Sequence, residues 1–143
     1  MDLWNIITDK IMKNRFESNR IIAEFMGATL KEVKEEFSVR GEDCVNEFIE
    51  VHGIKTPNFF GVPSIGNLKY DESWDWLMLA VERIESLGYI SIIERLKQPF
   101  VEHRVFFNSI NTFKEVANGG RHEDKLTAVY EAVIDFIQWM KKK

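Results

Sequence analysis

The segment that most limits the folds open to this chain is residues 70–96. YDESWDWLMLAVERIESLG has apolar residues at three- and four-residue spacing, which predicts a helix with Ser73 as N-cap and Gly88 as terminator. The inner face of this helix is expected to carry Trp74, Leu77, Val81 and Ile84. The next residues, YISIIERL, are rich in β-branched side chains and predict a strand. A helix that leads directly into a strand favours a fold that mixes helices with a sheet.

The C-terminal part of the chain extends this pattern. HRVFFNSINTFKEV predicts one further strand or two, with Val105, Phe107 and Phe113 as candidates to face inward. NGGRHED reads as a turn and a start signal, with Asp124 as N-cap of a closing helix that ends near Lys141. The apolar face of that helix is Leu126, Val129, Val133, Phe136, Ile137 and Met140.

The N-terminal part is expected to add helices. Residues 1–18 have helical spacing, and a second helix is expected to begin at Ser18 or Asn19 and to stop at Gly27. Residues 28–67 are interpreted as an insertion of two helical stretches and a loop. The overall prediction is a single α+β domain, 1–143, in which a small antiparallel sheet is flanked by helices in a sandwich-like arrangement. Its core would be an α-β-β-α unit at 68–140.

Composition excludes several classes of protein. The chain has 143 residues, of which 45% are apolar, and a net charge of −4 with acids and bases interspersed. These features argue against duplex nucleic acid as the main partner. A single cysteine, Cys44, excludes an internal disulfide and a multi-cysteine metal site. We recognise no signal peptide and no apolar run of about 18 residues, so we expect a cytoplasmic protein without a membrane partner.

The residue patterns predict no catalytic site, metal site or cofactor. The three histidines, His52, His103 and His122, have no metal-ligand spacing, and no G-x-S-x-G or phosphate-binding loop is present. Acidic neighbours disfavour a thiolate at Cys44, which we interpret as a packing residue. We therefore expect a protein that is not an enzyme.

Several residues are candidates for ligand binding. Arg95 and Arg104 fall on the predicted strands and Arg121 precedes the last helix, a suitable place for an anion. Tyr70 and Trp76 could stack on a base, so this set suits a nucleotide-like ligand. The alternative is that the arginines are solvated and that the aromatic side chains fill the core. Trp76 lies about 200° from Trp74 around the helix, so the two cannot both face one core. For Trp76 we favour packing beneath the 28–67 insertion over a subunit contact or a stacking surface.

The loop PNFFGVPSIG suggests a second kind of surface. Two prolines and two glycines exclude a regular helix there. Phe59 and Phe60 are then either held against the core or available to a protein partner.

Three stretches carry a resemblance to a family. NRIIAEFMG, LKYDESWDWLMLAVERIESLGY and KLTAVYEAVIDFIQW, which together span residues 19–27 and about 68–139, resemble small uncharacterised proteins of bacteriophages and Bacteroidetes. Their layout is similar to the phage ABA sandwich domain, in which two helices flank a small antiparallel sheet. The resemblance implies this fold and is almost silent on activity. Residues 1–18 and 28–67 depart from the pattern of the family.

Two functions are then open. The first is a phage-type sponge that sequesters a nucleotide-derived immune signal of the host without turning it over and acts as a homo-oligomer. The second is a protein-interaction module that inhibits a host protein or assists phage assembly through the 28–67 region and the exposed phenylalanines.

Overall fold

The protein is an α+β fold, as the sequence predicts. The computed structural model describes residues 3–97 and 101–143, with side chains for 14–97, 101–117 and 119–143. The helices are α1 (Leu3–Phe25), α2 (Trp74–Ser86) and α3 (Lys125–Lys141), and a 3₁₀ turn, η1, covers Ile65–Asn67. The strands are β1 (Thr29–Val39), β2 (Glu42–His52), β3 (Tyr89–Leu96), β4 (Glu102–Ser109) and β5 (Glu115–His122).

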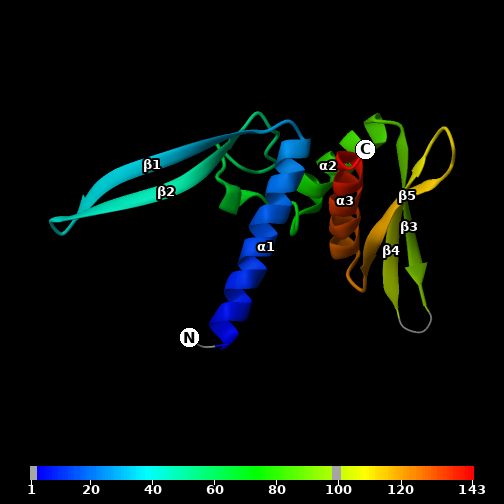
Figure 1. Cartoon of the computed structure of the whole chain (residues 1–143), viewed down its shortest axis with the longest axis horizontal. Coiled ribbons are helices and arrows are strands. Elements are labelled where there is room, and N and C mark those ends of the chain that lie inside the picture. The colour runs from blue at the N-terminus through cyan, green and yellow to red at the C-terminus, as the bar shows by residue number, and fades with distance from the viewer. Residues whose placement is uncertain (1–2, 98–100) are drawn as a thin grey trace.

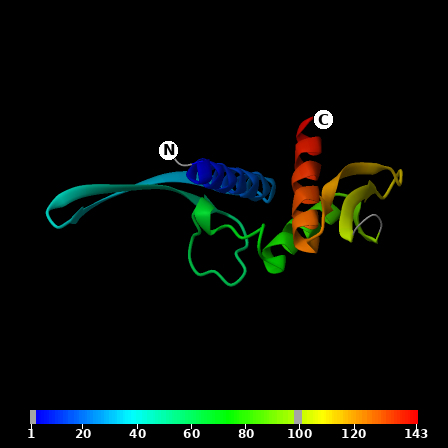
Figure 2. The same ribbon diagram turned by 90° about the horizontal axis from the view of Figure 1, so that it is seen from below.

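The strands form two separate antiparallel sheets at opposite ends of the molecule (Figure 1). β1 and β2 make a long hairpin at one end, and β3, β4 and β5 make a three-stranded sheet, in that order, at the other. The helices lie between them, with α3 packed along β4 and β5. The view from below in Figure 2 shows the hairpin extending away from the helices.

The core joins the three helices to the inner face of the three-stranded sheet. Val105 and Phe107 of β4 are fully buried, as their alternation along the strand predicts. Phe107 packs on Phe136 of α3 with ring centroids 5.3 Å apart. The predicted apolar face of α3 is confirmed, because Val129, Val133, Phe136 and Ile137 are buried while Leu126 and Met140 pack at its margin.

A pair of glycines lets α3 approach β5 closely. A Cβ atom placed on Gly120 would lie 2.3 Å from the Ala128 carbonyl oxygen and 2.6 Å from the Ala132 Cβ atom. The NGGRHED segment was expected to be a turn, but its first five residues belong to β5. Glycine is required there because α3 crosses the strand with no room for a side chain. Asp124 then begins α3, and its side chain accepts a hydrogen bond from the Thr127 N–H, which confirms the predicted N-cap.

The prediction of helices within residues 28–67 is wrong. Two 11-residue strands pair there in continuous register from Thr29 with His52 to Val39 with Glu42. Arg40 and Gly41 form the connection, both with positive φ, which is the backbone of a type I′ hairpin turn. The apolar residues of this region fit a helical spacing and a strand alternation alike, and the two-residue turn decides between them.

The N-terminal prediction of two helices is also wrong, because α1 continues without a break to Phe25. Asn19 is not an N-cap but a buried residue at the meeting point of three segments. Its Nδ2 donates to the Leu68 carbonyl oxygen at 3.2 Å and to Asp71 at 3.0 Å. Tyr130 of α3 donates its hydroxyl to Asn19 Oδ1 at 3.0 Å. This network stabilises the helix at the position where the sequence suggested a start, while Gly27 ends it as predicted with φ 95°.

Two further details differ from the prediction for the 68–140 region. The unit contains three strands rather than two, so its order is α-β-β-β-α. Phe113 does not face inward: it lies in the turn between β4 and β5, with φ 56° and 74% of its surface exposed.

Candidate functional site

The two tryptophans of α2 differ in burial, and the expectation fails for one of them. Trp76 is 1% exposed, whereas Trp74 is 38% exposed, so the assignment of Trp74 to the core is wrong. The indole Nε1 of Trp76 donates to the Pro57 carbonyl oxygen at 3.0 Å, and the Tyr70 ring meets the indole edge to face at 5.3 Å. Trp76 therefore packs beneath the segment that follows β2, which was the favoured interpretation of this residue.

Tyr70 and Trp76 are poorly placed to stack on a ligand. Both are almost completely buried, and their rings pack on each other. Burial also raises the pKa of the Tyr70 hydroxyl to about 12, because the charged phenolate is poorly solvated there. A base could reach either ring only if the covering loop moved.

Two of the candidate arginines are engaged with carboxylates on the sheet. Arg104 contacts Glu94 at 3.3 Å and Glu115 at 2.6 Å, and it stacks over the Phe106 ring at 4.3 Å. Arg121 lies opposite Arg104 in the register and pairs with Glu102. Arg95 is exposed on β3, where its register partner is His103.

The charges around these arginines do not favour an anion. Arg104 and Arg121 share one face of the sheet with three glutamates, so that the group as a whole is slightly acidic. The adjacent Glu102 also raises the pKa of the Arg121 guanidinium. A phosphate would have to compete with carboxylates that already hold the guanidinium groups.

The loop between β2 and η1 separates the two candidate phenylalanines. Phe59 is partly buried and packs against the core, whereas Phe60 is 99% exposed. The loop is anchored on both sides of Phe60 by the contact of Pro57 with Trp76 and by a 2.8 Å hydrogen bond from the Val51 N–H to the Pro63 carbonyl oxygen. Phe60 is thus an apolar side chain presented to solvent on an anchored loop.

A further exposed surface is the hairpin itself, residues 29–52, which we call the arm; the sequence pointed to this region but not to its form. Only its base contacts the core, through Leu30 and the buried register partner Val51. Beyond the base, most side chains on both faces are exposed, and the strands extend away from the helices (Figures 1 and 2). Isolated two-stranded hairpins are marginally stable in water at best, and among the described residues the arm pairs with no third strand.

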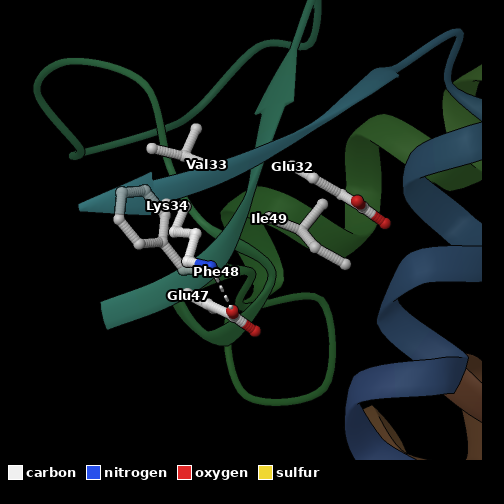
Figure 3. A pocket seen from close by; sticks show the side chains of 6 residues that line it. All are labelled: Glu32, Val33, Lys34, Glu47, Phe48 and Ile49. Atoms are coloured by element: carbon white, nitrogen blue, oxygen red, sulfur yellow. Dashed lines mark ion pairs between the residues drawn. The ribbon is translucent and has the colours of Figure 1, made fainter. Parts of the chain in front are cut away.

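The apolar side of the arm changes face along its length. At the base it is the face of Leu30 and Val51, which points into the protein's own core. Farther out, strand alternation places a second apolar group on the opposite face. This group, the apolar row, consists of Val33, Phe37, Val39, Cys44 and Phe48. Figure 3 shows the change around Phe48: Glu32 and Ile49 extend on the side of α1, and Val33 points away from it. The apolar row therefore faces away from the protein's own core.

The outer part of the opposite face is acidic. It carries Glu32, Glu36, Asp43 and Glu47, and its other residues are Lys34, Ser38, Val45 and Ile49. Lys34 and Glu47 form an exposed ion pair at 3.7 Å, which contributes little stability. The outer arm is thus amphipathic, with one face suited to burial and the other to water.

Three hollows follow the arm. One of about 540 Å³ lies within the twist of the hairpin and is lined by Glu32, Val33, Lys34, Glu47, Phe48 and Ile49 (Figure 3). The second, of about 380 Å³, lies nearer the tip and includes Phe37 and Cys44. The third, of about 370 Å³, lies between the arm and α1 and includes Phe16, Arg20 and Ile65. All three are lined by exposed and half-buried side chains, a form suited to a protein surface rather than to enclosure of a small molecule.

Among the described side chains, no group of three or more histidine, cysteine, aspartate or glutamate residues is arranged to hold a metal ion. Within residues 3–97 and 101–143, no helix has both the length and the apolar character that a membrane span requires.

Comparison with known proteins adds no assignment. No family model, no curated protein and no solved structure matches this chain. The resemblance to small phage and Bacteroidetes proteins therefore stays a prediction.

The signal for the arm was present in the sequence. VKEEFSVRGEDCVNEF has apolar residues on alternate positions around a two-residue turn that contains glycine. The competing helical spacing of the same apolar residues concealed it.

Proposed function

We propose that this protein is a protein-interaction module and that the arm is its main binding surface. The observation that carries the proposal is the apolar row, which lies on an extended hairpin and faces away from the protein's own core. Phe37 and Val39 are each about half exposed there, on a strand pair with no other covering element among the described residues. Apolar side chains gathered on one exposed face are typical of surfaces that bind other proteins.

Charge supports a protein rather than a nucleic acid as the partner. Residues 29–52 contain seven acidic and three basic side chains, a net charge of −4. A phosphate backbone would be repelled by this arm. An apolar contact surface on another polypeptide would accept the apolar row and leave the acidic face in water.

The nucleotide-sponge hypothesis has less support. Of its five candidate residues, Tyr70 and Trp76 are buried together, and Arg104 and Arg121 are paired with glutamates. Arg95 is exposed on β3.

Site-specific photo-crosslinking tests the proposal. A photoreactive residue in place of Val39 reports on the apolar face, and the same residue in place of its neighbour Ser38 reports on the acidic face as a matched control. In the cells that naturally make the protein, we expect discrete protein adducts from position 39. They should be competed by excess unlabelled protein and not by a Phe37→Ser protein.

The same experiment can reject the proposal. Equal labelling from positions 38 and 39, or adducts at 39 that excess protein does not compete, would show that the apolar row is not a specific binding surface. Adducts of the protein with itself and adducts with another protein both support it, since each is a specific contact through the arm.

A further inference from the structure

A two-residue connection joins β5 to α3 (Figure 1). β5 ends at His122, and Glu123 and Asp124 alone separate it from the first residue of α3. Asp124 is the N-cap of α3, and its carboxylate accepts hydrogen bonds from both the N–H and the hydroxyl of Thr127. We call residues 122–127 the junction, since they link the last strand to the helix that packs on it.

Two histidines hold the backbone of this connection. The Asp124 N–H donates to Nδ1 of His122 at 2.9 Å. Nδ1 of His103, on β4, lies 3.1 Å from the Glu123 carbonyl oxygen. His103 and His122 are register partners, so both imidazoles belong to the face of the sheet on which Val105 is buried. Each residue of the connection is therefore bonded to a different imidazole.

The backbone partners fix a different proton position in each ring. A backbone N–H can only donate, so Nδ1 of His122 carries no proton and the neutral ring has its proton on Nε2. A carbonyl oxygen can only accept, so Nδ1 of His103 carries a proton. His103 can take up a second proton at Nε2 and keep its bond. A second proton on His122 must go to Nδ1, and the bond from the Asp124 N–H is then lost.

The charges on the strands oppose a proton on His122. His122 shares its row across the sheet with His103 of β4 and Arg95 of β3, so this row contains basic side chains only. Arg121 and Glu102 lie on the opposite face, where they pair with each other. A charged His122 would add to the positive charge of its row.

The start of α3 gives a charged His122 no gain in hydrogen bonds. The charged residues there are all exposed, and they are Glu123, Asp124 and Lys125. Hydrogen bonds from Thr127 lower the pKa of the Asp124 carboxyl, and the charges of His122 and His103 lower it further. A charged His122 is attracted to this carboxylate but competes with Thr127 for it, while the positive end of the helix dipole disfavours a cation there. If His122 turns to the carboxylate or moves away from it, the junction loses a hydrogen bond in both cases.

We propose that the junction is a pH-sensitive switch, which is closed while His122 is neutral and opens when His122 takes up a proton. Histidine side chains change charge between about pH 5 and 8, so the bond to the Asp124 N–H is present at the upper end of this range and is lost as the pH falls through it. Opening loosens the first turn of α3 where it follows β5. The Asp124 carboxylate stays charged in this range, so the effect is separate from the loss of the cap at lower pH.

Amide hydrogen exchange of the full chain at pH 7.5 and pH 5.5 tests the switch. Protection factors correct the exchange rate for its intrinsic dependence on pH. At the Asp124 amide, protection should fall by about threefold to tenfold at the lower pH, which corresponds to the loss of one hydrogen bond. The amides of α2, a helix without histidine, serve as the internal reference and should change less than twofold. Equal protection of the Asp124 amide at the two pH values would overturn the proposal.

His122→Asn separates the acceptor from the charge. The asparagine Oδ1 can accept from the N–H two residues further on, as in an Asx turn, and it does not titrate. Protection of the Asp124 amide should therefore stay high at both pH values. His103→Asn is the matched control: it retains a donor for the Glu123 carbonyl and leaves His122 in place, so the fall should persist. The opposite result, a fall that persists in His122→Asn or disappears in His103→Asn, would contradict the role of His122.

Imidazole ¹⁵N spectra of the unmodified protein cover the case in which a variant does not fold. At pH 8 the ring proton should be on Nε2 in His122 and on Nδ1 in His103. As the pH is lowered, Nδ1 of His122 should become protonated over the same range in which the Asp124 amide signal shifts. A proton on Nδ1 of His122 at pH 8 would reject the switch, as would an Asp124 amide that does not respond when His122 titrates.

Discussion

Substitution of Gly120 by alanine is the sharpest test of how the fold is held together. The added Cβ atom would lie 2.3 Å from the Ala128 carbonyl oxygen, 2.6 Å from the Ala132 Cβ atom and 3.0 Å from the Ala132 nitrogen. Ordinary van der Waals contact begins near 3.4 Å, and two of these three atoms belong to the helix backbone. A side-chain rotation cannot relieve the clash, so α3 has to move away from β5 by roughly 1 Å.

The cost of that movement is large because α3 carries much of the core. A gap of 1 Å removes roughly a quarter to a half of the dispersion attraction of the atoms on either side. Phe136 and its neighbours on α3 would lose contact with Phe107 on β4. Overpacking in a core usually costs about 1–3 kcal/mol, and we expect Gly120→Ala to lower the free energy of unfolding by about 3 kcal/mol or more. For a chain of this size the melting temperature should fall by about 6–12 °C.

Urea denaturation followed by tryptophan fluorescence measures this change, and two other glycines provide matched controls. At Gly119 the added Cβ would meet only the Asp135 side chain, at 2.9 Å, which can rotate. At Gly66 the closest atom is 3.9 Å away. We expect the cost to decrease from Gly120→Ala to Gly119→Ala to Gly66→Ala. A Gly120→Ala protein as stable as the Gly66→Ala protein would refute the close packing of α3 on β5.

Three further predictions concern side chains whose environment the structure establishes. Trp76→Ala should lower the free energy of unfolding by about 3–5 kcal/mol, because the indole is buried. Trp74→Ala should lower it by less than about 1 kcal/mol, because this side chain is partly exposed. Equal losses in urea titrations would contradict the different burial of the two tryptophans. Burial raises the pKa of Tyr70 and of Tyr130 to about 12 in the folded protein, so both favour folding below pH 10 and lose this contribution as the pH rises from 10 to 12. For Tyr70 the loss is on the order of 2–3 kcal/mol. It is measurable as a fall of the melting temperature between pH 10 and 12, and Tyr70→Phe should make this fall smaller. The same fall in that variant would count against a raised pKa of Tyr70. The hydrogen bond with Thr127 lowers the pKa of Asp124, so the charged cap stabilises α3 above pH 4, and this stabilisation is lost as the pH falls through the lowered pKa. Asp124→Asn should retain the cap and make the stability depend less on acid pH, as followed by circular dichroism.

Local signals in the sequence were sufficient for two elements in the second half of the chain. The strand expected at YISIIERL is β3 in full, and the closing helix begins at the predicted N-cap Asp124. Both depend on interactions within a few residues: β-branched side chains in one case and a capping carboxylate in the other. The α+β class follows from these two elements and α2.

The arm shows where local signals become ambiguous. Val33, Phe37 and Phe48 fit the spacing of helices and also the alternation of strands. The helical spacing competes with the turn signal at Arg40 and Gly41. Cross-strand pairing over 11 residues settles the choice, and pairing depends on both halves of the hairpin at once.

The tryptophan pair separates the contribution of the sequence from that of the tertiary structure. Helical periodicity predicted that α2 buries Leu77, Val81 and Ile84 with Trp74 on the same face. In the structure Ala80 belongs to the buried stripe and the two tryptophans lie on its flanks. At 100° per residue, Trp74 lies roughly 70° from the centre of the buried face and Trp76 roughly 90°. This difference is too small to decide which of them is buried. The loop after β2 covers the flank of Trp76, where the Pro57 carbonyl accepts the indole hydrogen bond, and leaves Trp74 partly exposed. The sequence determined which residues compete for burial, and a contact across 19 residues of chain decided which of them is buried.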